Sequence, residues 1–189
     1  MRGILLDRDG VLNRERADYV KCWAEFEWLP GVLPALKQLA ACELPIIVIT
    51  NQSVIGRGIT TQATIEAIHQ RAKGEIEAVG GRIDDFFLCP HHPNEHCDCR
   101  KPKPGLLHQA AAKYQLTLAD SFFVGDALTD YQAAQAAGCQ SILVESGRQG
   151  STLRQQSQLQ AAQMASRTPP IVANLAAAVS LILEQVWHQ

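Results

Sequence analysis

The sequence predicts an α/β fold in which a parallel β-sheet is covered by helices on both faces. Short runs of β-branched, aromatic and other apolar residues recur along the chain, and each has the length and composition of a buried strand. Segments with helical spacing separate these runs. Because strands that alternate with helices pair in parallel and are covered by those helices, the two observations together indicate the fold class.

Five apolar runs are the predicted strands of this sheet: Ile4–Leu6, Ile46–Ile49, Asp85–Leu88, Phe122–Val124 and Ile142–Val144. The helices expected between them are Leu33–Ala40, Thr64–Ala78, Gly105–Tyr114 and Asp130–Ala137. The remaining chain predicts a solvated helix rich in glutamine and alanine, a short edge strand and a final helix that packs on the core: Ser151–Ala165, Ile171–Val172 and Leu175–Trp187. No internal repeat or linker divides the chain, so we expect one domain over residues 1–189.

Composition excludes several classes of partner. The 189 residues carry a net charge of −2 with both signs interspersed, so we expect no basic surface for nucleic acid. No apolar run approaches the ~20 residues of a membrane span, and the N-terminus lacks the apolar core of a secretory signal. We therefore expect a cytoplasmic monomer without a membrane partner, in which clustered cysteines bind metal or carry out redox chemistry.

Two acidic residues directly follow the first predicted strand. Asp7 and Asp9 stand at its carboxyl end, the edge where open α/β sheets bind ligands, and Gly10 allows the chain to turn there. Carboxylates that face one cleft can share a divalent cation or divide the roles of nucleophile and acid. Taken alone, the pair is equally compatible with the cap of a turn, so the other strand ends decide its interpretation.

Polar residues also follow the second and fourth predicted strands. The second is followed by a hydroxyl, amides and backbone N–H groups that suit phosphate oxygens, in Thr50, Asn51, Gln52 and Ser53. Asp126 follows the fourth strand at the same edge of the sheet. Asp130 lies one helical turn beyond it, where we expect it to orient Asp126 or a metal-bound water. Several strands thus deliver acids and hydroxyl groups to one crevice.

Three of the six cysteines and three of the six histidines fall within residues 89–99. Thiolate and imidazole are the preferred protein ligands of zinc, and four of them close a tetrahedral site with no position left for substrate, so we expect a structural zinc. Three thiolates come from Cys89, Cys97 and Cys99. Spacing alone does not choose the fourth ligand among His91, His92 and His96. The alternatives are a strained Cys97–Cys99 disulfide or free thiols.

Four motifs together resemble those of the haloacid dehalogenase-like phosphohydrolases: Asp7-x-Asp9, Thr50, Lys101 and Gly125-Asp126-x-x-x-Asp130. The resemblance implies a Rossmann-like three-layer sandwich in which Asp7 attacks phosphorus to form an aspartyl-phosphate. Asp9 would protonate the leaving alcohol and later activate water. The resemblance further implies a Mg²⁺ held by Asp7, the backbone carbonyl of Asp9 and Asp126, with the phosphoryl oxygens bound by Thr50, Asn51 and Lys101.

Within these phosphohydrolases, the run from Cys89 to Pro102 is similar to two subfamilies, the D-glycero-D-manno-heptose 1,7-bisphosphate phosphatases and the histidinol-phosphate phosphatases. Both carry a structural zinc in this loop, which implies as its ligands Cys89, His91, Cys97 and Cys99. The short interval between His91 and Cys97 is typical of the histidinol-phosphate group. The segment from Thr50 to Gly58 resembles the heptose group far better, and so does the length of the chain, so we favour the heptose group.

This resemblance implies a small phosphorylated sugar as substrate, from which the 7-phosphate is removed in the biosynthesis of nucleotide-activated heptose. The expected contacts of the substrate are Glu15, Tyr19, Gln52, Ser53 and Arg100. Ala127 departs from the family, which commonly has lysine after the Gly-Asp of its fourth motif, and this departure weakens the substrate assignment more than the nucleophile.

Neither of the two segments that could hold a large cap domain is long enough for one. These segments are 13–31 and the interval between the second strand and Cys89. An open crevice of this kind admits a small sugar. A further alternative, an inactive binding module stabilised by zinc, is disfavoured because Asp7 and Asp9 are both present.

Overall fold

A computed structural model of the chain describes residues 1–163 and 168–187. Six parallel strands form one sheet with the order β3-β2-β1-β4-β5-β6. They are β1 (Ile4–Leu6), β2 (Ile46–Asn51), β3 (Asp85–Cys89), β4 (Phe122–Gly125), β5 (Gln140–Val144) and β6 (Ile171–Val172). The predicted parallel α/β fold is confirmed, and every apolar run singled out in the sequence forms a strand of this sheet.

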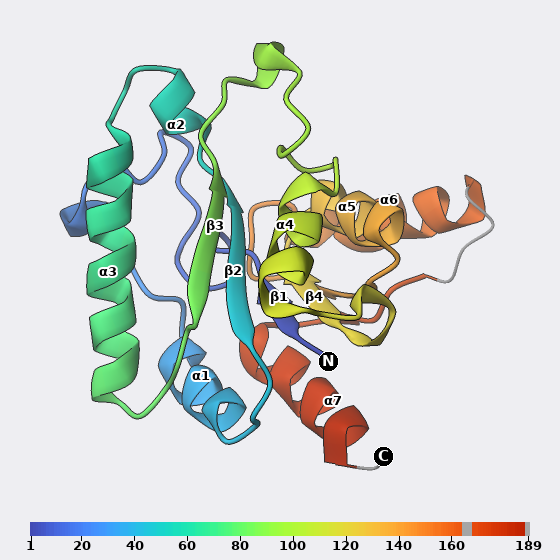
Figure 1. The fold of residues 1–189 in the computed structure, drawn as a ribbon. Helices are drawn as coiled ribbons and strands as arrows, with labels where there is room; N and C mark the ends of the chain where they lie inside the picture. The colour runs from blue at the N-terminus through green and yellow to red at the C-terminus, as the bar shows by residue number, and fades with distance from the viewer. Residues whose placement is uncertain (164–167, 188–189) are drawn as a thin grey trace.

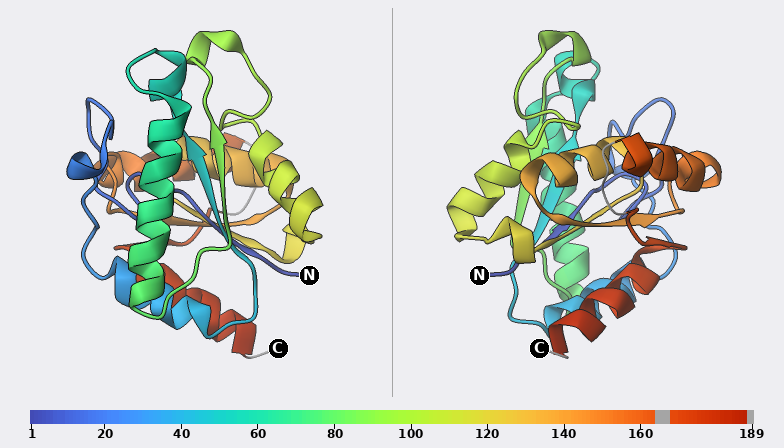
Figure 2. Two further views of the ribbon diagram at one scale, coloured as in Figure 1. Left: turned by 60° about the vertical axis from the view of Figure 1, so that its left-hand side comes forward. Right: turned by 90° about the vertical axis from the view of Figure 1, so that its right-hand side faces the viewer.

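Helices cover both faces of the sheet (Figures 1 and 2). One face carries α1 (Val32–Ala40), α3 (Gln62–Ala78) and α7 (Leu175–Trp187), and the other carries α4 (Gly105–Tyr114), α5 (Leu128–Ala137) and α6 (Gly150–Gln163). Successive residues of β1 pack against the helices of opposite faces, because side chains alternate along a strand. Ile4 and Leu6 belong to the core under α1 and α7, and Leu5 to the core under α4 and α5.

The helices differ from the prediction mainly at their ends. α3 begins two residues early because Thr61 caps it, accepting a hydrogen bond from the Thr64 N–H. A short helix that no pattern predicted, α2 (Ser53–Gly56), follows β2. The helix expected to have little to bury, α6, buries Leu153 completely. The last two residues of its predicted range, Met164 and Ala165, lie outside the described part of the chain.

The carboxyl ends of the central strands share one edge, and β1 lies between β2 and β4, where the strand order changes direction. Two loops rise from this edge, residues 13–31 and 90–104 (Figure 2). Each carries only one short 3-10 helix, Trp23–Glu25 and Pro93–Glu95, so within residues 1–163 and 168–187 no large cap domain covers the edge. Across the described residues, none of the helices has the length and apolar character that a membrane span requires.

Candidate active site

Asp7 is the first residue after β1, and its carboxylate reaches the site from the middle of the sheet. Its backbone N–H donates to the Val124 carbonyl at 2.8 Å, which extends the pairing of β1 with β4. Its Oδ1 lies 2.8 Å from Lys101 Nζ. Burial raises the pKa of Asp7 to about 7, and Lys101 opposes this shift while Asp130 adds to it. The ionised form of Asp7 therefore depends on the positive charge beside it.

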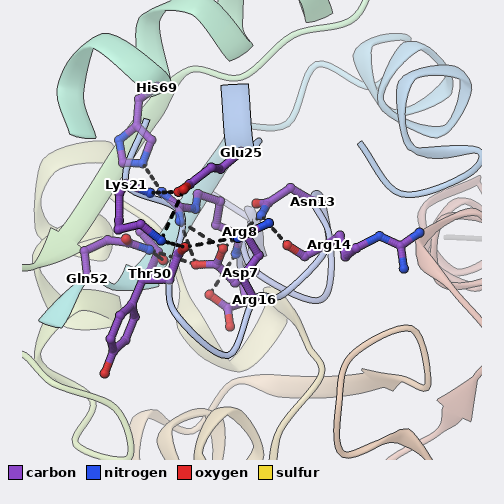
Figure 3. A network of polar contacts seen from close by, with 12 residues as sticks. Asp7, Arg8, Asn13, Arg14, Arg16, Lys21, Glu25, Thr50, Gln52 and His69 are labelled. Atoms are coloured by element: carbon purple, nitrogen blue, oxygen red, sulfur yellow. Dashed lines mark hydrogen bonds and ion pairs between the residues drawn. The ribbon is translucent and has the colours of Figure 1, made fainter. Parts of the chain in front are cut away.

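Asp9 is held by three side chains, those of Arg8, Asn13 and Gln52, which are labelled in Figure 3. Arg8 Nη2 donates to its two carboxylate oxygens at 2.9 and 2.8 Å, while the side-chain amides of Asn13 and Gln52 donate at 2.9 and 2.8 Å. Burial favours the neutral acid, but the Arg8 guanidinium and these hydrogen bonds hold the pKa of Asp9 below its usual value. One quarter of the Asp9 side chain, 25 %, stays exposed. Asp9 thus presents a carboxylate of fixed orientation to the pocket.

The residues at the end of β2 face the same pocket but make different contacts. Thr50 is buried, and its hydroxyl accepts a hydrogen bond from Gln52 Nε2 at 2.9 Å. Asn51 uses both ends of its amide on Lys101: Nδ2 donates to the Lys101 carbonyl and Oδ1 accepts from the Lys101 N–H, each at 3.1 Å. The amides of Asn51 and Gln52 are therefore occupied by protein groups.

Lys101 is buried between two carboxylates. Its Nζ lies 2.8 Å from Asp7 Oδ1 and 2.8 Å from Asp130 Oδ1, and it donates to the Ile49 carbonyl at 3.1 Å. Burial favours the neutral amine, but Asp130 and Asp7 raise the pKa of Lys101 well above its usual value, so the ammonium stays charged. Asp130 Oδ2 also accepts from the Asp126 N–H at 3.1 Å, and in this way Asp130 orients Asp126 through its backbone.

Asp126 completes a cluster of carboxylates with Asp7 and Asp130, in which one oxygen from each residue lies within 4.8 Å of the other two. Two glycines make room for it, because a Cβ at Gly10 or at Gly147 would overlap Asp126 Oδ2. Burial, with the charges of Asp130 and Asp7, raises the pKa of Asp126 well above its usual value. Three buried carboxylates beside one ammonium group carry excess negative charge. Such a set of oxygen donors fits a divalent cation such as Mg²⁺.

A pocket of about 360 Å³ opens over these groups, and its outer wall is basic. Besides Arg8, which holds Asp9, the arginines that line the pocket are Arg16, Arg57, Arg100 and Arg148. Arg16 pairs with Asp18 at 3.1 Å, and Arg57 lies over the ring of Tyr19 at 5.9 Å. Arg100 differs, because its Nη1 is buried and has no hydrogen-bond partner among the residues that the structure describes. The pocket therefore combines an inner acidic cluster with an outer wall that suits an anion.

The five residues that the sequence assigned to the substrate all line this pocket: Glu15, Tyr19, Gln52, Ser53 and Arg100. Glu15 belongs to the loop of residues 13–31 and accepts a hydrogen bond from the Arg148 N–H at 3.2 Å. Arg148 lies in the loop after β5. This contact connects two loops that are far apart in sequence and that both line the pocket.

Cys89, His91, Cys97 and Cys99 come together at the carboxyl end of β3. Four of the six distances between their ligand atoms, the three Sγ atoms and His91 Nδ1, are 3.2 to 3.6 Å, and all of these atoms lie within 4.8 Å of one another. Zn–S bonds of about 2.3 Å and a Zn–N bond of about 2.0 Å give tetrahedral edges of roughly 3.5 to 3.8 Å, so the four residues fit zinc. His92 instead caps the 3-10 helix Pro93–Glu95, and His96 is exposed. The geometry thus selects His91 among the three histidines.

Hydrogen bonds connect this cysteine-histidine cluster to the end of β2. The Cys89 carbonyl accepts from the Gln52 N–H, and the Pro90 carbonyl accepts from the Gly56 N–H, each at 2.8 Å. At the other end of the cluster, Lys101 follows Cys99 by two residues. The cluster therefore supports two walls of the pocket.

Comparison with known proteins places this site in a family. A family model described as HAD-hydrolase-like matches residues 98–178. The D-glycero-beta-D-manno-heptose-1,7-bisphosphate 7-phosphatase of Pseudomonas putida is 43 % identical over 153 residues, which cover 81 % of this chain and 87 % of that protein. This chain belongs to the heptose 1,7-bisphosphate 7-phosphatase family of haloacid dehalogenase-like hydrolases.

Other heptose bisphosphatases are similar in sequence and in structure. The D-glycero-alpha-D-manno-heptose-1,7-bisphosphate 7-phosphatase of Mycobacterium tuberculosis is 39 % identical and aligns over 78 % of this chain and 81 % of its own. The crystal structure of D,D-heptose 1,7-bisphosphate phosphatase from Bordetella bronchiseptica, complexed with magnesium and phosphate, is 37 % identical with a TM-score of 0.87. That similarity covers 98 % of this chain and 99 % of the Bordetella chain.

Sequence reasoning missed several residues of this heptose bisphosphatase site. Arg8 and Asn13, which hold Asp9, lie beside the recognised motif but carry no spacing signal of their own. Gly147 and Arg148 follow β5, whose carboxyl end has no motif. His69, which contacts Arg8, had one available signal, because it is a polar residue on the apolar face of a helix.

Proposed function

We propose that this chain is a Mg²⁺-dependent phosphatase that removes the 7-phosphate of D-glycero-D-manno-heptose 1,7-bisphosphate through an aspartyl-phosphate. The observation that carries the proposal is the position of Asp7, whose carboxylate opens into a polar pocket 2.8 Å from a buried lysine. The similarity to the Pseudomonas and Bordetella enzymes supports the same substrate and disfavours histidinol phosphate.

The proposed reaction has two halves that share one acid-base residue. Asp7 attacks phosphorus and forms a P–O bond while the bond between phosphorus and the sugar oxygen breaks, and Asp9 donates a proton to that oxygen. Asp9 then takes a proton from the water that attacks the aspartyl-phosphate, which releases inorganic phosphate and restores Asp7. Thr50 would donate a hydrogen bond to the phosphoryl oxygens, and Lys101, whose three donors reach Asp7, Asp130 and the Ile49 carbonyl, would bind them by exchanging its contact with Asp7. The negative charge of the bound phosphate favours the protonated form of Asp9 that the first half needs.

Two metals belong to this proposal. Asp7, Asp126 and the backbone carbonyl of Asp9 would hold Mg²⁺, whose charge offsets the repulsion between carboxylates and phosphate. Zinc would be held by Cys89, His91, Cys97 and Cys99, where it would cross-link the loop that leads to Lys101. Asn51 then contributes to phosphate binding by holding the Lys101 backbone beside Thr50.

We propose that the second phosphate of the substrate binds at the basic outer wall of the pocket. Arg100 has a buried Nη1 without a partner, which suits a phosphate oxygen. Arg57 and Arg148 lie on the same wall and supply the positive charge that Ala127 does not. The sugar would contact Glu15, Tyr19, Gln52 and Ser53, which line the space between the two phosphate positions.

We further propose that the chain works as a single-domain monomer in the cytoplasm, without nucleic-acid or membrane partners. Three of the six cysteines gather in the proposed zinc site, the use of clustered cysteines that a reducing compartment favours, and the net charge of −2 offers no broad attraction to nucleic acid. Light scattering of the purified protein in solution tests the monomer.

A phosphate-release assay tests the proposed function. The purified chain with Mg²⁺ is offered both anomers of heptose 1,7-bisphosphate, histidinol phosphate and fructose 1,6-bisphosphate. We expect a heptose bisphosphate to be hydrolysed with the highest kcat/KM, and the two anomers to separate the Pseudomonas-like preference from the Mycobacterium-like one. Asp7→Asn should reduce the rate to background, whereas Asp120→Asn, at an exposed position far from the pocket, should not. Preferred hydrolysis of histidinol phosphate, or an active Asp7→Asn, would contradict the proposal.

A further inference from the structure

His69 is a polar residue on the buried face of α3. As the structure describes this helix, its other buried residues are Ile65, Ile68, Ala72 and Ile76. The His69 ring is 3 % exposed and stacks on Phe86 of β3, with ring centroids 4.4 Å apart and planes 13° from parallel. A buried imidazole in such surroundings needs a hydrogen-bond partner.

The partner of His69 is Arg8, which lies between the two acids of the first motif (Figure 3). Arg8 Nη1 is 3.3 Å from His69 Nε2. Because a guanidinium has only donors, His69 Nε2 accepts this hydrogen bond. Burial and the adjacent Arg8 charge lower the pKa of His69 to about 3, so the ring is neutral and keeps its acceptor near neutral pH.

Arg8 has few other anchors. Its side chain is 1 % exposed, its Nη2 binds both oxygens of Asp9, and its Nε is buried without a partner. Within the described residues, the hydrogen bonds of the guanidinium thus run to Asp9 on one side and His69 on the other. Without His69, the guanidinium would keep only its contact with Asp9, which alone does not define its orientation.

We propose that His69 is a positioning residue for phosphoryl transfer, which fixes Arg8 so that Arg8 holds the Asp9 carboxylate in the orientation that protonates the leaving oxygen. The inference rests on the proposed function, because it takes Asp9 as the acid. It connects a helix on one face of the sheet, α3, to the carboxyl end of β1. Asn13 and Gln52 hold Asp9 as well, so we expect loss of His69 to weaken protonation rather than abolish it.

Two substrates with different leaving groups distinguish a positioning role of His69 from a purely structural one. A sugar oxygen must be protonated as it leaves, whereas p-nitrophenolate leaves without a proton, and kcat/KM covers only the steps up to departure of this group. His69→Phe keeps an aromatic ring against Phe86 and removes the acceptor. We expect its kcat/KM to fall about tenfold or more for the heptose bisphosphate but less than about threefold for p-nitrophenyl phosphate. His69→Gln, which retains an acceptor, should restore most of the loss.

His108→Phe is the matched control, because His108 is exposed on α4 and should leave both rates unchanged. If His69→Phe does not fold, Arg8→Met tests the same contact and should show the same loss for the sugar substrate only. The double variant Arg8→Met with His69→Gln should then lose no more than Arg8→Met alone.

Equal losses on the two substrates, or no rescue by His69→Gln, would overturn the role of His69. Either result is distinguishable from failure of the proposed function, because the wild-type chain is measured in parallel. A wild type that hydrolyses p-nitrophenyl phosphate but not heptose bisphosphate overturns the substrate, and the comparison then uses the best alkyl phosphate of the panel. A wild type that hydrolyses no phosphate ester overturns both proposals.

Discussion

Asn51 and Lys101 are joined by two hydrogen bonds, in which the Asn51 amide pairs with the backbone N–H and carbonyl of Lys101 at 3.1 Å each. The contact attaches the loop that follows the cysteine-histidine cluster to the last residue of β2. Lys101 is thereby held at its backbone by Asn51 and at its Nζ by Asp7 and Asp130. Its ammonium group consequently sits at a defined place in the pocket.

Asn51→Ala is expected to lower kcat and stability together. Two lost hydrogen bonds reduce the free energy of unfolding by about 2 kcal/mol, and the displaced ammonium lowers kcat by about tenfold or more. Urea unfolding and phosphate release measure the two effects. Asn94→Ala, at an exposed position of the neighbouring loop, is the control. An Asn51→Ala variant with unchanged kcat would show that Asp7 and Asp130 position Lys101 unaided.

Asp126→Asn is expected to stabilise the metal-free protein while it removes Mg²⁺-dependent activity. Burial raises the pKa of Asp126 above 3.8, so the folded state retains a proton that the unfolded state releases. The free energy of unfolding therefore falls as pH rises from the unfolded-state pKa to the raised pKa of the folded state. Above the raised pKa, the whole cost of the buried charge is present. Asparagine carries no charge and should gain about 1 kcal/mol or more at pH 8. Urea unfolding with a chelator measures this, with Asp120→Asn as control, and a less stable Asp126→Asn would be inconsistent with the charge argument.

Gly147→Ala is expected to weaken Mg²⁺ binding. A methyl group here would overlap Asp126 Oδ2, and the loop is not free to retreat because Ser146 Oγ donates to the Gly10 carbonyl at 2.7 Å. We expect the Mg²⁺ concentration for half-maximal activity to rise about tenfold, as for other displaced supports of a metal ligand.

Gly74→Ala is the control for adding a methyl group where there is room for it. Gly74 is a helical residue, and apart from its chain neighbours and its own helix backbone no described atom lies within 4 Å of a Cβ built there. The variant should raise the free energy of unfolding by about 0.5–1 kcal/mol without changing the Mg²⁺ requirement. An unchanged Mg²⁺ requirement in Gly147→Ala would mean that Asp126 tolerates displacement.

Cys99→Ser is expected to lose zinc, stability and activity together. The variant keeps only three of the four proposed ligands, and Cys99 lies two residues before Lys101 in the same loop. We expect a zinc content well below one per chain and a thermal midpoint lower by several degrees. Metal analysis and thermal unfolding measure both, with Cys22→Ser as control because Cys22 is exposed and outside the cluster. A fully metallated Cys99→Ser of normal stability would remove Cys99 from the proposed ligand set.

The amino-acid sequence was enough to predict the fold class, the strands of the sheet and the edge at which the site lies. These features are local, because a buried strand must be apolar throughout, and the residues directly after it must emerge at its carboxyl end. Asp7, Asp9, Thr50 and Asp126 could therefore be assigned to one crevice before their positions were known. The predicted start of α3 was wrong by two residues, because the position of a helix end depends on a single capping hydrogen bond.

How these residues are held and charged depends on contacts between distant parts of the chain. Packing pairs Asn51 with Lys101 and brings His69 to Arg8 across 61 residues of sequence. It also brings His91 to the three cysteines, where spacing alone left three histidines open and the family resemblance implied His91. Such contacts depend on how helices and loops pack on the sheet, which no short pattern encodes. The raised pKa of Asp7 has the same origin, because desolvation is a property of everything that surrounds a group and not of its neighbours along the chain.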